Sequence, residues 1–168
     1  MPLNRPPGFK LTYWMNHGTK GDNPHTTKEV DIIVSKGVEY LKEQGYTDIG
    51  AVGYCFGAKY VVRFQSEAQG ASINVGYIAH PSLVEGDELA AIKGPLSIAA
   101  AEKDKIFTKE LRHKSEDILV ATTQPYQISL FSGVGHGFAV RGDLGDKQEK
   151  WSKERAFEQA LQWFNFHL

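Results

Sequence analysis

The chain is predicted to adopt an α/β fold, a mostly parallel sheet flanked by helices. Two observations predict it. Short apolar runs that fit buried strands alternate with longer stretches whose apolar residues recur at helical spacing. Strands alternating with helices of this length imply right-handed crossovers and a parallel sheet. In addition, the 168 residues are 41% apolar and contain neither an internal repeat nor a low-complexity tract, which predicts a single domain over residues 1–168.

Residues 1–25 are predicted to be rich in loops. Four of the chain's seven prolines lie there, namely Pro2, Pro6, Pro7 and Pro24, and proline removes the N–H donors that a sheet ladder needs. The first regular element is a helix from residue 26 to about residue 44. Thr26 and Glu29 form a capping box at its start, and Gly45 ends it. Its apolar face consists of Val30, Ile33, Val34, Val38 and Leu41.

The rest of the chain alternates strands and helices. Strands are predicted at 49–52, 73–79, 96–101 and 126–131, and helices at 57–68 and 108–119. The chain ends in a further helix, whose apolar residues at helical spacing are Phe157, Ala160, Leu161, Phe164 and Leu168. This stripe is interpreted as core packing rather than as a ligand site.

A cysteine with a glycine on either side, two residues away, follows the first of these strands. The segment Gly53-Tyr54-Cys55-Phe56-Gly57 contains the only cysteine of the chain. This is the pattern of a nucleophile elbow, in which a nucleophile lies between two glycines, each two residues away, at the turn from a strand to a helix. The elbow holds the central residue at a strained backbone angle. The N-terminus of the new helix favours the thiolate over the thiol. The alternative interpretation is a buried structural thiol in a glycine-rich turn.

A thiol nucleophile needs a base, and the base needs an orienting acid. In α/β-hydrolases the chain order is nucleophile, acid, histidine. Asp104 follows the strand over 96–101, and His136 lies in a glycine-rich loop after the strand over 126–131. We therefore predict Asp104 as the orienting acid and His136 as the general base, with glycines on both sides that let its ring approach neighbouring backbone.

Other interpretations of these positions remain open. Asp104 could cap the helix that starts near Thr108 or be a solvated loop charge, and Glu102 is a competing acid two residues away. His80, which also lies just past a predicted strand, could bind substrate, support the site from behind, or be a packed histidine bonded to backbone.

These residues carry a resemblance to a known family. From residue 49 onward the chain resembles the dienelactone hydrolase family of the α/β-hydrolase superfamily, and its fungal members in particular. The matching segments are 50–60 (GAVGYCFGAKY), 79–82 (AHPS), 101–104 (AEKD) and 130–143 (LFSGVGHGFAVRGD). The resemblance places the family's Cys, Asp and His on Cys55, Asp104 and His136. It implies hydrolysis of lactones and esters, as in carboxymethylenebutenolidase, without cofactor or metal.

The oxyanion hole of this superfamily uses the N–H of the residue after the nucleophile, here Phe56, and one from a loop after an earlier strand. Family members place several strands and helices before the segment that matches residues 2–9, so we expect the N-terminal strands, and with them a second donor, to be absent here. Whether the chain is a fragment or a natural short form stays open. Arg141 is the candidate for binding a substrate carboxylate, and a solvated loop arginine is its alternative.

Without earlier strands, the nucleophile strand would become a sheet edge, and an exposed apolar edge favours pairing and aggregation. We therefore expect a homodimer, a swapped segment or residues 1–25 to cover it.

Composition limits the other partners. Nineteen basic and twenty acidic side chains give a net charge of −1 without a basic run, so nucleic acid and anionic membranes are poor partners. One cysteine allows no internal disulfide, and the chain has neither a signal-peptide pattern nor an 18-residue apolar stretch. A cytoplasmic location is the expectation. Zinc is not expected, because the cysteine and the histidines lack ligand spacing.

The sequence therefore predicts hydrolysis of an ester or lactone through a thioester on Cys55, with His136 as base and Asp104 as its orienting acid. Two alternatives come from other classes: a catalytically incompetent fragment or pseudoenzyme, and a redox-responsive protein in which Cys55 is oxidised.

Overall fold

The computed structural model describes residues 8–168, so the part of the loop prediction that falls on residues 1–7 lies outside the described residues. The chain divides into two compact units, residues 1–45 and residues 46–168, which are described separately. The single domain predicted from the length stays a prediction.

The first unit contains two helices, α1 (Leu11–His17) and α2 (Thr27–Glu43). The loop prediction is wrong over α1. The described stretch between Gly8 and Asn23 contains no proline, so nothing in it blocks a short helix, and the Trp14 indole packs at a tilt against the His25 ring with centroids 3.8 Å apart. The capping box of α2 is confirmed, since the Thr26 N–H donates to the Glu29 carboxylate at 3.2 Å.

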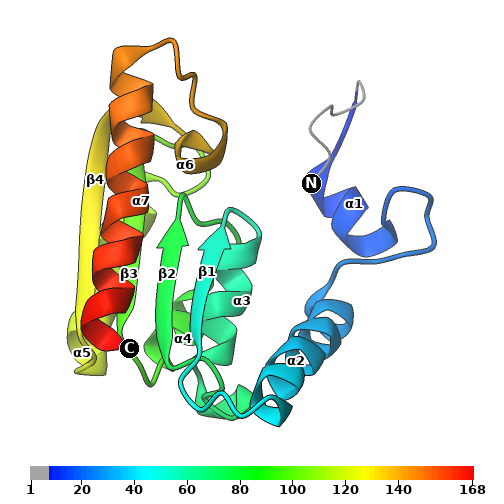
Figure 1. Ribbon diagram of the computed structural model, residues 1–168. Coiled ribbons are helices and arrows are strands. Elements are labelled where there is room, and N and C mark those ends of the chain that lie inside the picture. Colours follow the sequence, from blue (N-terminus) through cyan, green and yellow to red (C-terminus); the bar gives the residue numbers. More distant parts are fainter. Residues whose placement is uncertain (1–7) are drawn as a thin grey trace. The chain divides into compact units, whose positions relative to one another are not determined.

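The second unit is built on four parallel strands in the order β1-β2-β3-β4 (Figure 1). They are β1 (Gly50–Tyr54), β2 (Val75–Ala79), β3 (Leu96–Lys103) and β4 (Tyr126–Gly135). Within residues 8–168, β1 pairs with β2 alone and no strand precedes it. The nucleophile strand is therefore an edge of the described sheet, as predicted, and Val52 on it is 46% exposed.

Helices cover both faces of this sheet. One face carries α3 (Gly57–Phe64), α4 (Gly86–Ala90) and α5 (Lys109–Thr122), and the other carries α7 (Lys147–His167) and the short α6 (Phe138–Arg141) (Figure 1). Alternate residues of the strands enter two separate cores: Ile78 packs among α3, α4 and α5, whereas Tyr77 and Ala79 pack beneath α6 and α7. Because β3 is covered on both faces, residues 96–101 are all buried, which explains their unbroken apolar run.

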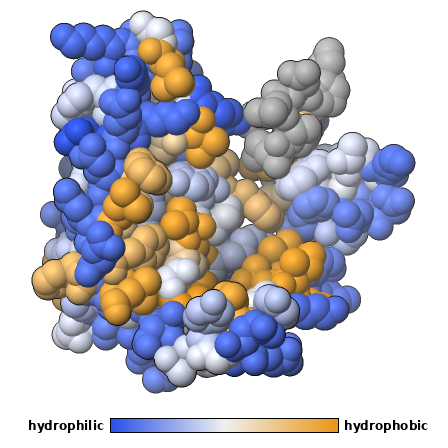
Figure 2. All heavy atoms as spheres, viewed as in Figure 1, coloured by the Kyte–Doolittle hydropathy of each residue, from blue (hydrophilic) through white to orange (hydrophobic). Residues whose placement is uncertain are grey.

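The face that carries α7 also exposes apolar side chains, which gather over α7 and the neighbouring strands (Figure 2). Phe157 on α7 is 59% exposed and Leu161 is 47% exposed. The terminal stripe that was predicted to pack in the core is therefore only partly buried. None of the helices within residues 8–168 combines the length and the apolar character needed to span a membrane.

Two predicted boundaries differ because polar side chains end the elements early. The helix predicted over 57–68 stops at Phe64 and gives way to a 3-10 helix, η1 (Glu67–Gln69), since the Ser66 hydroxyl donates to the Arg63 carbonyl at 2.7 Å. The strand predicted from residue 73 begins at Val75, because the Asn74 side chain accepts the Ile49 N–H at 2.9 Å.

Near the site, the structure contains regular elements where loops were expected. The loop predicted over 132–138 is strand as far as Gly135, where β4 stays paired with Lys103 of β3 across a register shift. The helices α4 and α6, of five and four residues, were not predicted.

Candidate active site

The elbow around Cys55 has the predicted strained geometry. Cys55 lies between β1 and α3 with a φ of 51°, a left-handed value that residues with a Cβ rarely adopt. A Cβ on Gly53 would lie 2.7 Å from the Ala58 Cα and from the Gly57 carbonyl oxygen, so only glycine fits. A Cβ on Gly57 would meet no atom within 4 Å. The close packing of the elbow therefore requires glycine at position 53, whereas a side chain would meet no atom at position 57.

The fold brings the three residues of the predicted catalytic set together. His136 follows β4, and its Nε2 lies 3.1 Å from the Cys55 Sγ. Its Nδ1 lies 2.8 Å from Oδ2 of Asp104, which follows β3. The other carboxylate oxygen of Asp104 accepts the N–H groups of Ile106 and Phe107, at 2.8 and 3.1 Å. These bonds fix the carboxylate, whose side chain is fully buried, so it presents one oxygen to the imidazole.

Hydrogen bonds of the neighbouring residues decide between the alternatives for the orienting acid. Glu102 points away from the imidazole and accepts the Gly133 N–H at 2.7 Å. The cap of α5 is Thr108, whose hydroxyl oxygen accepts the Leu111 N–H at 3.4 Å. Asp104 is therefore the acidic side chain that contacts His136.

The charges of this cluster favour an ion pair between sulfur and imidazole. Burial raises the pKa of the Cys55 thiol, but hydrogen bonds from His136 and Ser82 and the charge of His136 outweigh it and bring the pKa to about 7. Burial lowers the pKa of His136, but its bonds to Asp104 and Cys55 outweigh that effect and raise the pKa to about 9. Between these values the sulfur is a thiolate and the imidazole is protonated.

His80 is buried beside this pair. Its ring is edge-on to the His136 ring at a centroid distance of 5.1 Å, and neither of its nitrogens has a hydrogen-bond partner among the described residues. Burial and the charge of His136 lower the pKa of His80 to about 4, so it stays neutral at physiological pH. Of the three interpretations that the sequence allows for His80, a packed histidine bonded to backbone through its ring is the one that this geometry does not show.

Arg141 lies at the end of α6, so it is a helical residue and not the loop residue that was expected. It is exposed, and its guanidinium lies over Gly137, where a Cβ would be only 2.6 Å from Nη2. It therefore lies next to the glycine that directly follows His136.

Two functional contacts were missed by the sequence analysis. The Ser82 hydroxyl lies 3.4 Å from the Cys55 Sγ, and the buried Lys59 ammonium donates to the Leu83 carbonyl at 3.0 Å. Ser82 belongs to the segment 79–82 that carried the family resemblance, but no pattern in the sequence indicated that its hydroxyl reaches the sulfur. The Phe56 N–H, the predicted oxyanion donor, also contributes to the low pKa of Cys55.

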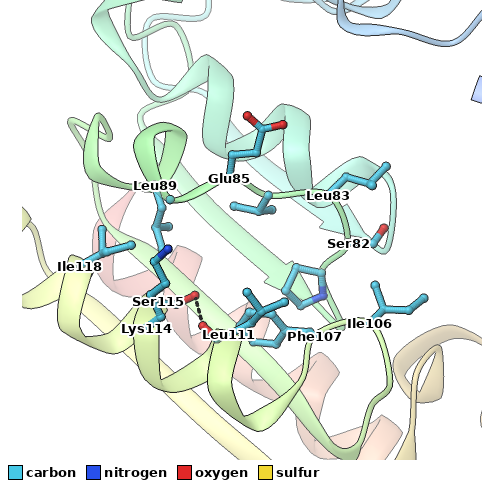
Figure 3. A pocket seen from close by; sticks show the side chains of 13 residues that line it. Ser82, Leu83, Glu85, Leu89, Ile106, Phe107, Leu111, Lys114, Ser115 and Ile118 are labelled. Atoms are coloured by element: carbon cyan, nitrogen blue, oxygen red, sulfur yellow. Dashed lines mark hydrogen bonds between the residues drawn. The ribbon is translucent and has the colours of Figure 1, made fainter. Parts of the chain in front are cut away.

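A small pocket begins at Ser82. It lies between the segment after β2 and helix α5, with Ser82, Leu83 and Ile106 toward one end and Ile118 toward the other (Figure 3). Its volume is about 60 Å³, so it has room only for a small group. Apolar side chains supply most of its wall, which also includes Val84, Leu89, Phe107 and Leu111.

Comparison with known proteins gives a consistent result. The model of the dienelactone hydrolase family matches residues 15–168. All of the chain aligns with hydrolase pyvD of Aspergillus violaceofuscus at 43% identity and covers 65% of that protein. Dienlactone hydrolase 1 of Gibberella moniliformis is 33% identical over 99% of the chain and 61% of its own length. The chain therefore spans a little under two thirds of the length of these fungal relatives.

A solved structure supports the same fold. The dienelactone hydrolase-like promiscuous phosphotriesterase from metagenomic libraries superposes with a TM-score of 0.65 over 83% of this chain and 62% of that one. Because the two sequences are only 14% identical, this likeness concerns the fold alone.

Proposed function

Because the chain belongs to the dienelactone hydrolase family, we propose that it hydrolyses carboxylic esters or lactones, with Cys55 as nucleophile, His136 as acid and base, and Asp104 as the orienting acid. The observation that supports this most directly is the contact of 3.1 Å between the Cys55 sulfur and His136 Nε2, backed by the 2.8 Å contact of Nδ1 with Asp104. A nucleophile, a base and an orienting acid in direct series are the arrangement that acyl transfer requires.

The first step is acylation. The Cys55 thiolate attacks the ester carbonyl, the S–C bond forms, and the C–O bond to the leaving group breaks. The protonated His136 lies next to the sulfur and gives its Nε2 proton to the departing alkoxide. Asp104 holds the Nδ1–H through this change, so the imidazole keeps the orientation and tautomer needed. The Phe56 N–H stabilises the negative oxygen of the tetrahedral intermediate.

The second step is hydrolysis of the thioester. The neutral His136 takes a proton from water, the new C–O bond forms, and the C–S bond breaks to restore the thiolate. For a lactone, the alkoxide remains tethered to the acyl group, so water must attack before the ring closes again. A thiolate with a pKa of about 7 is a good leaving group, which suits activated substrates such as enol lactones rather than peptide bonds.

The surroundings of the sulfur favour a small, partly charged substrate. The pocket of about 60 Å³ that starts at Ser82, with its mostly apolar wall, suits a small aliphatic group. The exposed Arg141 side chain, which lies next to Gly137, would attract a carboxylate group of the substrate. The unpartnered ring nitrogens of the buried His80 would bond a polar group that enters the site.

Steady-state hydrolysis of an enol lactone and of an activated phenyl ester tests the proposal. The wild-type chain is compared with Cys55→Ala, and iodoacetamide titrates the thiol. Because Cys55 is the only cysteine, alkylation reports on this residue alone. Turnover that disappears in Cys55→Ala and after alkylation is expected. Alkylation of a reactive thiol without turnover of either substrate would contradict hydrolysis by this chain and favour the incompetent or redox-responsive alternatives.

A further inference from the structure

We propose that Ser82 is a further catalytic residue, whose hydroxyl donates a hydrogen bond to the Cys55 sulfur and stabilises the thiolate before attack and again when the thioester C–S bond breaks. Ser82 is 3% exposed, and its Oγ lies 3.4 Å from the Sγ. Within residues 8–168 this hydroxyl has no other hydrogen-bond partner. The assignment rests on the proposed function, because it concerns the same sulfur.

The direction of this hydrogen bond follows from where the proton is. His136 Nε2 lies 3.1 Å from the same sulfur, on a ring that is tied to Asp104. When the thiol proton moves to the imidazole, the sulfur can only accept. Of the two atoms 3.4 Å apart, the Ser82 hydroxyl is then the donor. Hydrogen bonds to an ionised acceptor are the strong ones, and here the donor Ser82 is buried while the Cys55 sulfur is half-buried.

The backbone holds Ser82 against the elbow. The Ser82 N–H donates to the Cys55 carbonyl at 3.1 Å, and the Cys55 N–H donates to the Ala79 carbonyl at 3.2 Å. The two segments are thereby tied by a pair of bonds on either side of the sulfur. Cys55, His80 and Leu83 all have positive φ values, of 51°, 37° and 63°. Such conformations cost free energy and persist where the surrounding structure fixes them.

A buried cation keeps this segment in place from the other side. The Lys59 ammonium, on the helix that begins at the elbow, donates to the Leu83 carbonyl at 3.0 Å. It also pairs with the Glu88 carboxylate at 2.7 Å and with Glu85 at 3.3 Å. Lys59 is therefore a positioning residue: it fixes the residue after Ser82 relative to the same helix whose N-terminus faces the sulfur.

Several titratable groups surround the sulfur and bear on its protonation. His136 contacts it directly, and Asp104 acts through His136. His80 faces the His136 ring, the Tyr54 ring lies 5.9 Å from His80, and the charge of Arg141 acts on His80. Burial raises the pKa of Cys55, while the bonds from His136 and Ser82 lower it. Replacing Ser82 leaves all of the other groups in place.

The test measures the pH dependence of Cys55 alkylation by iodoacetamide in Ser82→Ala, Ser82→Thr and the wild-type chain. Ser82→Ala removes one oxygen and adds no atom, and Ser82→Gly serves as a second deletion. Ser72→Ala is the control, because Ser72 is also buried and its hydroxyl donates to the Gln69 carbonyl, away from the sulfur. We expect the deletions to raise the midpoint by about one pH unit, which lowers alkylation at pH 7 about fivefold. In Ser82→Thr, which keeps a hydroxyl, the midpoint of alkylation should rise by less than in the two deletions.

Turnover distinguishes catalysis from packing. If Ser82 stabilises the thiolate, kcat falls in the deletions and the midpoint of alkylation moves. If Ser82 only lines the pocket of Figure 3, KM alone changes and the midpoint stays; an unchanged midpoint overturns the proposal. A shifted midpoint in a chain that hydrolyses no ester would refute the proposed function and the catalytic role of Ser82, and would leave only its hydrogen bond to the thiolate.

Discussion

The replacement Asp104→Asn tests the orienting role of the buried acid. In the wild-type chain Oδ1 of Asp104 accepts two backbone N–H groups and Oδ2 faces His136 Nδ1 at 2.8 Å. An asparagine has one oxygen, and the two N–H donors will hold it. Its NH₂ group must then face Nδ1, which forces Nδ1 to accept and places the single imidazole proton on Nε2. In that tautomer the ring cannot take a proton from Cys55.

The magnitude follows from the two pKa values. Asp104 is the largest of the groups that raise the pKa of His136 from 6.5 to about 9, against the effect of burial. Each pKa unit corresponds to a factor of ten in the protonation equilibrium, and because Cys55 supplies part of this rise, loss of Asp104 removes the larger but not the whole part. Burial raises the pKa of Cys55 and mainly the His136 contact lowers it, to about 7. Without the imidazolium it returns toward 9.0, and the thiolate fraction at pH 7 falls from about one half to about one in a hundred.

The assay is the rate of iodoacetamide alkylation as a function of pH, with kcat/KM for an activated ester measured in parallel. The midpoint should rise by more than about one unit in Asp104→Asn. Glu102→Gln is the matched control, because Glu102 lies two residues away and accepts the Gly133 N–H instead. An Asp104→Asn variant with an unchanged midpoint and near-normal turnover would refute the reasoning, and so would a loss confined to Glu102→Gln.

Four further outcomes are expected. The pH profile of kcat/KM is bell-shaped: activity is lost below about 7, where the thiolate is protonated, and above about 9, where the imidazolium loses its proton; a flat profile from 6 to 10 would contradict the ion pair. Leu111→Trp, which fills the pocket, reduces hydrolysis of butyrate more than of acetate esters, whereas Val120→Trp, at a position 63% exposed on the same helix, changes neither. Gly53→Ala destabilises the fold by about 1–3 kcal/mol, because its Cβ would be 2.7 Å from backbone; Gly57→Ala, with no atom within 4 Å, should melt at the wild-type temperature. We expect the edge of β1 in the described sheet to pair with a second copy, so light scattering should give a dimer that Val52→Lys dissociates, and a wild-type monomer would count against this pairing.

The sequence was sufficient for the parts of the site that depend on local signals. The elbow was predictable because a strand, a glycine-flanked cysteine and a helix are adjacent in the chain. Asp104 was predicted as the acid, but Glu102 stayed open as an alternative, since residues two apart on a strand point to the same side. A register shift between Ala101 and Lys103 breaks this alternation. As a result, Glu102 accepts the Gly133 N–H and Asp104 contacts His136. No local pattern in the sequence predicts such a shift.

Contacts between segments that are distant in the chain also could not be predicted from the sequence. Ser82 reaches Cys55 across 27 residues, and Lys59 reaches Leu83 across 24. Both depend on the pairing of β1 with β2, which places the ends of these strands side by side. The short helices α4 and α6 were missed for a different reason. With five and four residues, they are too short for helical periodicity to appear.

The length of β4 allows His136 to reach Cys55 from the opposite edge of the described sheet. Cys55 follows β1 and His136 follows β4, at opposite edges of the described sheet. Strands lie about 4.8 Å apart, so these edges are separated by roughly 14 Å, yet the two side chains meet at 3.1 Å. The ten residues of β4, against five of β1, carry the chain beyond the ends of β1 and β2. Positive φ values at Gly133 and Gly137, of 78° and 95°, then turn it back, and α6 lies beyond the arrowhead of β2 (Figure 1). Gly133 and Gly137 are therefore required by the path of the chain, which must cross the carboxyl end of the sheet to bring the base to the sulfur.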